Sequence, residues 1–289
     1  MAIKVFTKEY AGLLENVYEK NALFLETFGG KLQVKDGVAD KNFLTLKVTD
    51  SEAVIQEYST DDNVGFGTGT GKTTRFGNRK EIKAIDETVA YEAPLTIHEG
   101  VDSVTVNDNA EQVIEERTGI HAEAWTEKLN SLLAKALSDN ANATVISGKL
   151  DEAGVKKAFA EAKKHFVNNK VTKRLTWRAY VTPEVYNVIL ESGLTTSAKK
   201  SSADIDNGEV KKFKGFVLVE TPDEYFQNSE NIFFAVDNAG QAGVGLDTYR
   251  IIDSEDFNGV SIQSVAKFGK YIPEKNKKAV YKAKLTATV

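Results

Sequence analysis

A helical pattern of apolar residues continues for about thirty residues, from 108 to 139, and few folds can accommodate a helix of that length. Asp108 and Glu111 form a capping-box pattern at its start. Apolar side chains then recur at helical spacing: Val113, Ile114, Ile120, Ala124, Trp125, Leu129, Leu132, Leu133 and Leu137. At 1.5 Å per residue such a helix is roughly 45 Å long. It is either a spine between subdomains or half of a coiled coil, and since no heptad persists across it, the pattern favours a spine.

Before this helix, two extended segments flank a polar, glycine-rich loop. We expect strands at 53–59 and 79–95, joined by residues 60–77. In the second strand Ile82, Ile85 and Val89 do not keep a two-residue alternation, so the hairpin lacks a continuous apolar face. A long hairpin without such a face cannot be buried on its own core, and it is predicted to lie on a partner.

The loop carries GFGTGTGKTTRFGNRK at residues 65–80, which raises the alternative of a phosphate-binding loop. Gly71, Lys72 and Thr73 match the end of a Walker A motif, but the position that requires the first glycine is Phe66. A P-loop also joins a buried strand to an apolar-faced helix, and both flanks here are polar. A P-loop hydrolase is therefore a remote alternative, and the glycines indicate conformational freedom at a loop tip.

Composition argues against several kinds of site. A net charge of −5 and a pI near 5.5 argue against nucleic-acid binding through a basic face. The chain has no cysteine, and its three histidines are far apart: His98, expected in a turn, and His121 and His165, expected in helices. We therefore expect no catalytic triad, no metal site and no cofactor. No apolar stretch is long enough for a membrane span or a signal peptide, so we expect a soluble protein made in the cytosol.

The remaining segments mix helices and strands. Residues 7–30 are predicted to form an amphipathic helix that ends at Gly29 and Gly30. This helix covers either the chain's own core or, as an arm, a neighbouring subunit. Further helices are expected at 151–167 and 182–192, and strands at 43–49, 175–181, 215–222, 231–236, 249–253, 260–268 and 275–289. This order indicates an α+β or mixed α/β fold.

The arrangement of arm, polar hairpin, long helix and mixed domain resembles the major capsid protein of tailed bacteriophages with the Hong Kong 97-type fold. The resemblance extends over essentially the whole chain and is most specific in TRFGNRKEIKAIDETVAYEAPLTIHEGVD (74–102) and VIEERTGIHAEAWTEKLNSLLAKALSDNA (113–141). It implies an α+β capsid fold with these parts: an N-terminal arm (1–30), a peripheral-domain strand region (31–50), an extended E-loop hairpin (51–92), the peripheral domain with its spine helix (93–144), an axial domain (145–245) and returning peripheral strands (246–289).

The resemblance also implies a function. The chain is expected to be a non-enzymatic coat protein that assembles into pentamers and hexamers of an icosahedral head and encloses double-stranded DNA without sequence-specific binding. The implied partners are further copies, a portal protein and a scaffolding protein, which the start at Met1 predicts to be a separate chain. The expected location is the virion, after assembly in the host cytoplasm, without membrane contact.

The resemblance places the intersubunit contact at the tip of the E-loop, where glycines would give adaptability and cations would meet acidic surface: Gly65, Gly67, Gly69, Gly71, Lys72, Arg75, Arg79 and Lys80. The nearer alternative is an encapsulin-type nanocompartment, which shares the fold but packages enzymes instead of DNA.

Overall fold

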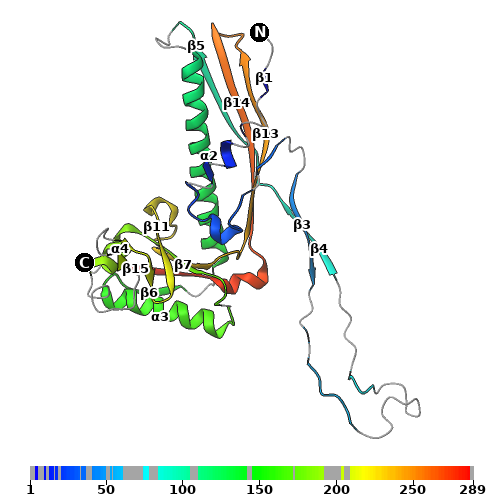
Figure 1. Cartoon of the computed structure of the whole chain (residues 1–289), viewed down its shortest axis with the longest axis vertical. Helices are drawn as coiled ribbons and strands as arrows, with labels where there is room; N and C mark the ends of the chain where they lie inside the picture. The colour runs from blue at the N-terminus through cyan, green and yellow to red at the C-terminus, as the bar shows by residue number, and fades with distance from the viewer. Residues whose placement is uncertain are drawn as a thin grey trace. The chain divides into compact units, whose positions relative to one another are not determined.

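The structure is a computed structural model that divides into two compact units, Lys41–Ala90 and the remainder, Met1–Asp40 with Tyr91–Val289 (Figure 1). It describes residues 4–5, 10, 13–15, 17–18, 21–32, 34–36, 41–49, 53, 55–60, 74–77, 84–104, 110–141, 145–171, 173–191, 203–204 and 209–286.

The smaller unit is built on an antiparallel pair, β3 (Asn42–Thr49) and β4 (Ala84–Ala90). The strand predicted at 43–49 is confirmed. The strand predicted at 79–95 differs, because β4 ends at Ala90 and a new strand begins only at Leu95, after Pro94. Pro94 has no backbone N–H to donate to a ladder, and β5 begins directly after it. The strand predicted at 53–59 is wrong, since the described residues of that stretch are not in a strand.

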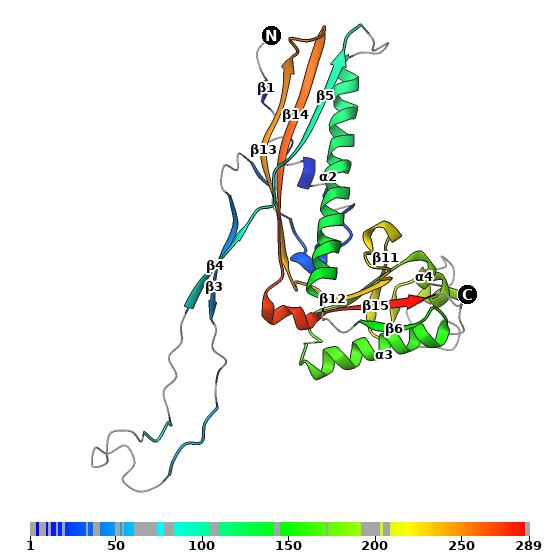
Figure 2. The same ribbon diagram turned by 180° about the vertical axis from the view of Figure 1, so that it is seen from behind.

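The larger unit contains a five-stranded sheet in the order β1-β13-β14-β5, with β2 parallel to β13. Its strands are β1 (Lys4–Val5), β2 (Val34–Asp36), β5 (Leu95–Asp102), β13 (Gln241–Asp253) and β14 (Gly259–Tyr271). The predicted long helix is confirmed as α2 (Ala110–Asn140), which runs beside this sheet in both ribbon views (Figures 1 and 2). Trp125 of α2 packs against Phe268 of β14, with ring centroids 5.7 Å apart.

The N-terminal segment packs on the chain's own core. Its described residues between 10 and 21 are mostly helical, and η1 (Leu25–Phe28) follows and ends at Gly29, whose φ is 109°. Tyr10, Tyr18 and Phe24 are buried in the same cluster as α2, and the Tyr10 ring stacks on Tyr249 at 3.8 Å. Of the two alternatives for this helix, the structure therefore favours packing on the chain's own core over an arm on a neighbour.

A second, six-stranded sheet has the order β10-β11-β7-β12-β15-β6. Its strands are β6 (Ile146–Lys149), β7 (Trp177–Val181), β10 (Lys212–Phe213), β11 (Phe216–Glu220), β12 (Ile232–Val236) and β15 (Val280–Thr286). Helix α3 (Glu152–Asn168) confirms the helix expected at 151–167 and lies along this sheet, as Figures 1 and 2 show, with Val155, Phe159, Ala162 and Phe166 buried. The other elements here are α4 (Pro183–Glu191), η2 (Asp223–Tyr225), η3 (Glu274–Ala279), and the small pair β8 (Ala203–Asp204) and β9 (Glu209–Val210).

Two further expectations differ from the structure. His98, expected in a turn, lies inside β5 opposite Gln263 of β14, because the pairing with β14 continues through the neighbouring Gly100. The segment 246–289 was assigned as a group to the peripheral strands. Its strands β13 and β14 pair in the five-stranded sheet, whereas β15 belongs to the six-stranded sheet, between β12 and β6.

Candidate functional site

Of the eight residues predicted at the loop tip, the structure describes Arg75. The other seven, Gly65, Gly67, Gly69, Gly71, Lys72, Arg79 and Lys80, lie outside the described residues. Arg75 ties two parts of the loop together: its guanidinium donates to the Ser59 carbonyl at 3.2 Å, and its own carbonyl accepts from the Ser59 N–H at 3.0 Å. Part of the hydrogen-bonding capacity of Arg75 therefore serves its own loop.

The turn beside Arg75 is closed by Thr74 and Gly77. The Thr74 hydroxyl donates to the Gly77 carbonyl at 2.8 Å, and the Gly77 N–H donates to the Thr74 carbonyl at 3.0 Å. Gly77 has a φ of 75°, and a Cβ at this position would collide with the side chain of Gln56. The positive φ favours glycine here, whereas the exposed Gln56 side chain could move aside for a Cβ.

The same loop exposes large apolar side chains that the sequence analysis did not identify as a contact. Ile55 is 98% exposed, Phe76 is 79% exposed and Tyr58 is 53% exposed, and the rings of Tyr58 and Phe76 meet edge to face at 5.2 Å. We call these three residues the apolar loop cluster. The sequence shows that these residues are apolar within a polar stretch. Because 53–59 was predicted to be a strand, their exposure to solvent was not predicted.

A second candidate is a group of charged residues that joins β5 to α2. The Arg117 guanidinium donates to both carboxylate oxygens of Glu99, with Nε at 2.7 Å from Oε2. His121 is 2% exposed, and its Nε2 lies 2.9 Å from the same Oε2. Hydrogen bonding to Arg117, above the opposing effect of burial, lowers the pKa of Glu99 to about 2. A carboxylate so stabilised in its charged form is a poor general base and serves instead as a structural clamp.

The other two histidines also have structural partners. His98 lies with its Nε2 3.3 Å from the Gln263 amide. The His165 ring stacks on Tyr281 at 4.4 Å, and its Nε2 lies 3.1 Å from the Lys278 carbonyl. Burial lowers the pKa of His165. Within the described parts of the chain, no three His, Asp or Glu side chains gather closely enough to hold a metal ion.

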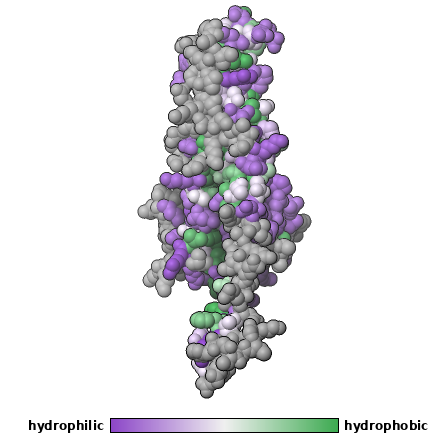
Figure 3. Space-filling view, turned by 90° about the vertical axis from the view of Figure 1, so that its right-hand side faces the viewer, coloured by the Kyte–Doolittle hydropathy of each residue, from purple (hydrophilic) through white to green (hydrophobic). Residues whose placement is uncertain are grey.

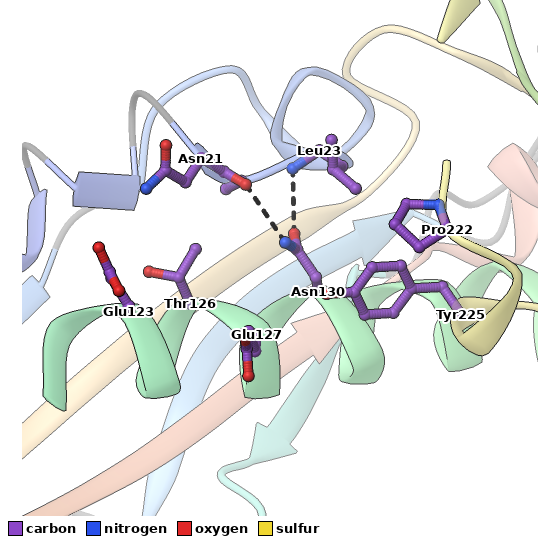
Figure 4. A pocket seen from close by; sticks show the side chains of 9 residues that line it. Asn21, Leu23, Glu123, Thr126, Glu127, Asn130, Pro222 and Tyr225 are labelled. Atoms are coloured by element: carbon purple, nitrogen blue, oxygen red, sulfur yellow. Dashed lines mark hydrogen bonds between the residues drawn. The ribbon is translucent and has the colours of Figure 1, made fainter. Parts of the chain in front are cut away.

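Figure 4 shows an open hollow of about 460 Å³ between residues 21–23, α2 and η2. Asn130 of α2 is buried at its centre, where its amide oxygen accepts from the Leu23 N–H at 3.0 Å and its amide nitrogen donates to the Asn21 carbonyl at 3.3 Å. Glu123 and Glu127 stand on the helix at its rim. Asn130 acts as a clip that holds the N-terminal segment on α2, because both ends of its amide are occupied by backbone groups.

A further polar group lies at the end of α2 and connects this helix to the six-stranded sheet. Glu230 is buried, and its carboxylate accepts from the Ser138 hydroxyl at 2.7 Å and pairs with the Lys282 ammonium at 2.7 Å. Lys282 also donates to the Ser138 carbonyl at 3.0 Å. These residues come from α2, the segment before β12, and β15, so they join the long helix to the six-stranded sheet.

On the face shown in Figure 3, hydrophilic side chains predominate among the coloured residues, with smaller apolar areas between them. No helix in the described part of the chain combines the length and apolar character that crossing a membrane requires.

The architecture matches solved phage capsids. The capsid structure of cyanophage P-SCSP1u matches with a TM-score of 0.66 at 11% identity, over 92% of this chain and 89% of that chain. The mature capsid of bacteriophage PhiM1 matches with a TM-score of 0.65 at 10% identity, over 93% and 88%. A virus-like particle from Pyrococcus furiosus matches with a TM-score of 0.52 at 13% identity, over 96% and 99%. No protein-family model and no curated protein sequence matches the chain. The chain therefore has the tailed-phage major capsid protein fold.

Proposed function

We propose that this chain is the major capsid protein of a tailed bacteriophage, a non-enzymatic subunit that assembles into pentamers and hexamers of an icosahedral head around double-stranded DNA. The observation that carries the proposal is the match with two phage capsids over about nine-tenths of each chain. A scaffolding protein and a portal protein are the proposed assembly partners, and the mature location is the virion.

The domain assignment is proposed on the same basis. Helix α2 is the spine, and the five-stranded sheet with α2 forms the peripheral domain. The six-stranded sheet with α3 and α4 forms the axial domain, which on the observed pairing includes β15. The unit Lys41–Ala90 is the E-loop, ten residues earlier at its start than residue 51.

The proposed role of the E-loop is to cover a neighbouring subunit. None of the side chains described between 41 and 90 is buried, so this unit contributes nothing described to the chain's own core. Burial of the apolar loop cluster against a neighbour would stabilise the contact by about 25 cal/mol for each Å² of apolar surface removed from water. The proposed contact therefore combines this cluster with the basic tip residues, Lys72, Arg75, Arg79 and Lys80, and the glycines 65, 67, 69 and 71 between them.

Negative-stain electron microscopy of the purified protein tests the proposal, both alone and co-expressed with a candidate scaffolding protein. We expect closed shells, tubes or capsomer rings. A chain that stays monomeric in both preparations contradicts the proposal, and a nucleotide titration of the wild type and Lys72→Ala would then examine the P-loop alternative.

A nanocompartment shell is the second candidate, because the Pyrococcus furiosus virus-like particle is matched over 96% of this chain. Its lower TM-score, 0.52 against 0.66 and 0.65, favours the phage capsid. The contents of shells from the native source separate the two: double-stranded DNA supports a phage head, and an enzyme cargo supports a nanocompartment.

A further inference from the structure

One edge of the six-stranded sheet carries a concentration of cations. Four of the nine residues that line an open hollow of about 410 Å³ are basic: Lys163 of α3, Lys173 and Arg174 before β7, and Lys212 of the edge strand β10. We call these four residues the basic patch. All four are exposed, and the lining contains no carboxylate. The floor is formed in part by Trp177, whose side chain is buried in the core beneath.

Neighbouring lysines extend the patch. Lys214, two residues beyond Lys212, donates to the carbonyl of Lys156 at 2.8 Å. Burial, and then repulsion from Lys156 and Lys163, lowers the pKa of Lys214. Repulsion between like charges costs free energy, and the part that involves Lys156 is offset within the chain, because the Lys156 ammonium lies 2.6 Å from the Glu152 carboxylate.

Two hollows of the larger unit have linings of opposite charge, which the net value of −5 does not reveal. A hollow of about 370 Å³ on the five-stranded sheet is lined by four acids, Glu99, Asp253, Glu255 and Asp256. The basic patch lies on the other sheet. A local positive potential can attract a polyanion even when the whole protein is acidic. The sequence-based argument from net charge therefore does not hold for this surface.

Edge protection explains only part of the patch. Lysine on an edge strand discourages pairing with another chain, and Lys212 fits that role. Lys163, Lys173 and Arg174 are not on the edge strand, so edge protection does not account for these three residues.

We propose that the basic patch binds the phosphate groups of double-stranded DNA without reading its sequence. Exposed lysines are suited to this task, because a mobile ammonium group contacts phosphates without fixed geometry. A protein partner is less favoured, since interfaces rely on aromatic anchors and the one aromatic side chain of the lining, Trp177, is buried. That the polyanion is DNA rests on the proposed capsid function, whereas phosphate binding by the patch does not.

The test is fluorescence anisotropy of a labelled 30-base-pair duplex of arbitrary sequence with the unassembled full chain at several salt concentrations. The patch variant is Lys163→Gln, Lys173→Gln and Lys212→Gln. The matched control is Lys31→Gln, Lys128→Gln and Lys149→Gln, which removes the same charge from exposed lysines elsewhere, including β6 at the opposite edge of the sheet. Circular dichroism verifies that both variants are folded.

We expect the patch variant to lose about tenfold or more in affinity at 50 mM salt, and its plot of log K against log salt to become shallower by about 2.7, or 0.9 per lost phosphate contact. The slope for the control variant should differ from the wild-type slope by less than about 0.9, the value for one phosphate contact. The proposal is overturned if the wild type does not bind, if the patch variant binds as the wild type does, or if both variants lose the same affinity. Binding of labelled polyglutamate but not DNA, abolished in the patch variant, would overturn it in favour of an acidic protein partner.

The two proposals fail separately. If the chain forms no shells but binds DNA through the patch, the capsid function is contradicted and the phosphate site stands. If the chain forms normal shells but binds no DNA, the phosphate site is contradicted and the capsid function stands.

Discussion

Glu99 connects a strand to the long helix through one carboxylate. It receives two hydrogen bonds from Arg117 and lies 2.9 Å from His121, both on α2. The pKa of Glu99 is lowered from 4.5 to about 2, with hydrogen bonding to Arg117 as the first cause. The charged form is therefore favoured in the folded chain, and its contribution to stability is present above pH 4.5 and is lost as the pH falls toward 2.

Replacing Glu99 with glutamine should lower the free energy of unfolding at pH 7 by about 1 kcal/mol, a modest figure because the pair is partly exposed to solvent. The difference in the free energy of unfolding between the variant and the wild type should become smaller as the pH falls from 4.5 to 2, because protonation of Glu99 removes the same charge from the wild type. Urea unfolding at pH 7, 4 and 3 measures this. Glu115→Gln, on the exposed side of the same helix, is the control. An equal deficit at all three pH values would contradict the assigned role of the ion pair.

This clamp shows what single residues of the sequence cannot reveal. The helical period correctly placed His121 on a helix, but its burial against Glu99 depends on β5 lying along α2, a contact between distant elements. His98 was misplaced because a neighbouring glycine suggests a turn when no pairing partner is known. Its partner, Gln263, is 165 residues away.

At the scale of elements, the group of Ser138, Glu230 and Lys282 joins α2 to β15 of the six-stranded sheet. The side chains of Glu230 and Lys282 are both largely buried, so removing one leaves the other charge without compensation.

Lys282→Met should therefore lower the free energy of unfolding by about 3 kcal/mol. The double variant Lys282→Met with Glu230→Gln should recover part of this loss, because a neutral amide can still accept from the Ser138 hydroxyl. Urea denaturation of the two single variants and the double variant forms a thermodynamic cycle. Additive losses would show that the two side chains do not stabilise each other.

Helices were predicted correctly because their apolar spacing is a local pattern. Strands were predicted less well, because their extent depends on pairing with distant strands. Helices α2 and α3 follow from apolar spacing alone. The strands predicted at 249–253 and 260–268 are parts of the 13-residue strands β13 and β14. Strand β13 begins earlier than predicted and includes Gly243 and Gly245, because each of these glycines is paired with a residue of β14. In contrast, residues 53–59 contain valine, isoleucine and tyrosine but do not form a strand among those described, since side-chain propensity without a partner or burial is insufficient.

The two units of the molecule differ in how much hydrophobic core stabilises them. The larger unit has both hydrophobic core clusters, whereas the unit Lys41–Ala90 has none of the buried side chains described. The sequence predicted this difference from the missing alternation at Ile82, Ile85 and Val89. It could not predict which side chains would be exposed on the loop, because exposure depends on the path of the backbone around Arg75 and Ser59.

The exposed apolar residues of the smaller unit lead to a prediction about assembly. The double variant Ile55→Ser with Phe76→Ser should keep the melting temperature of the unassembled chain, because the wild-type side chains already face solvent. If these residues are buried against a neighbouring subunit, each should contribute about 1.5–3 kcal/mol per contact, so shells should be reduced or absent. Val104→Ser, which removes another exposed apolar side chain from the larger unit, should leave assembly unchanged. Thermal unfolding and electron microscopy of the three proteins measure both effects. Normal shells from the double variant would mean that the proposed contact does not involve the apolar loop cluster, and a lower melting temperature would mean that the cluster stabilises the chain itself.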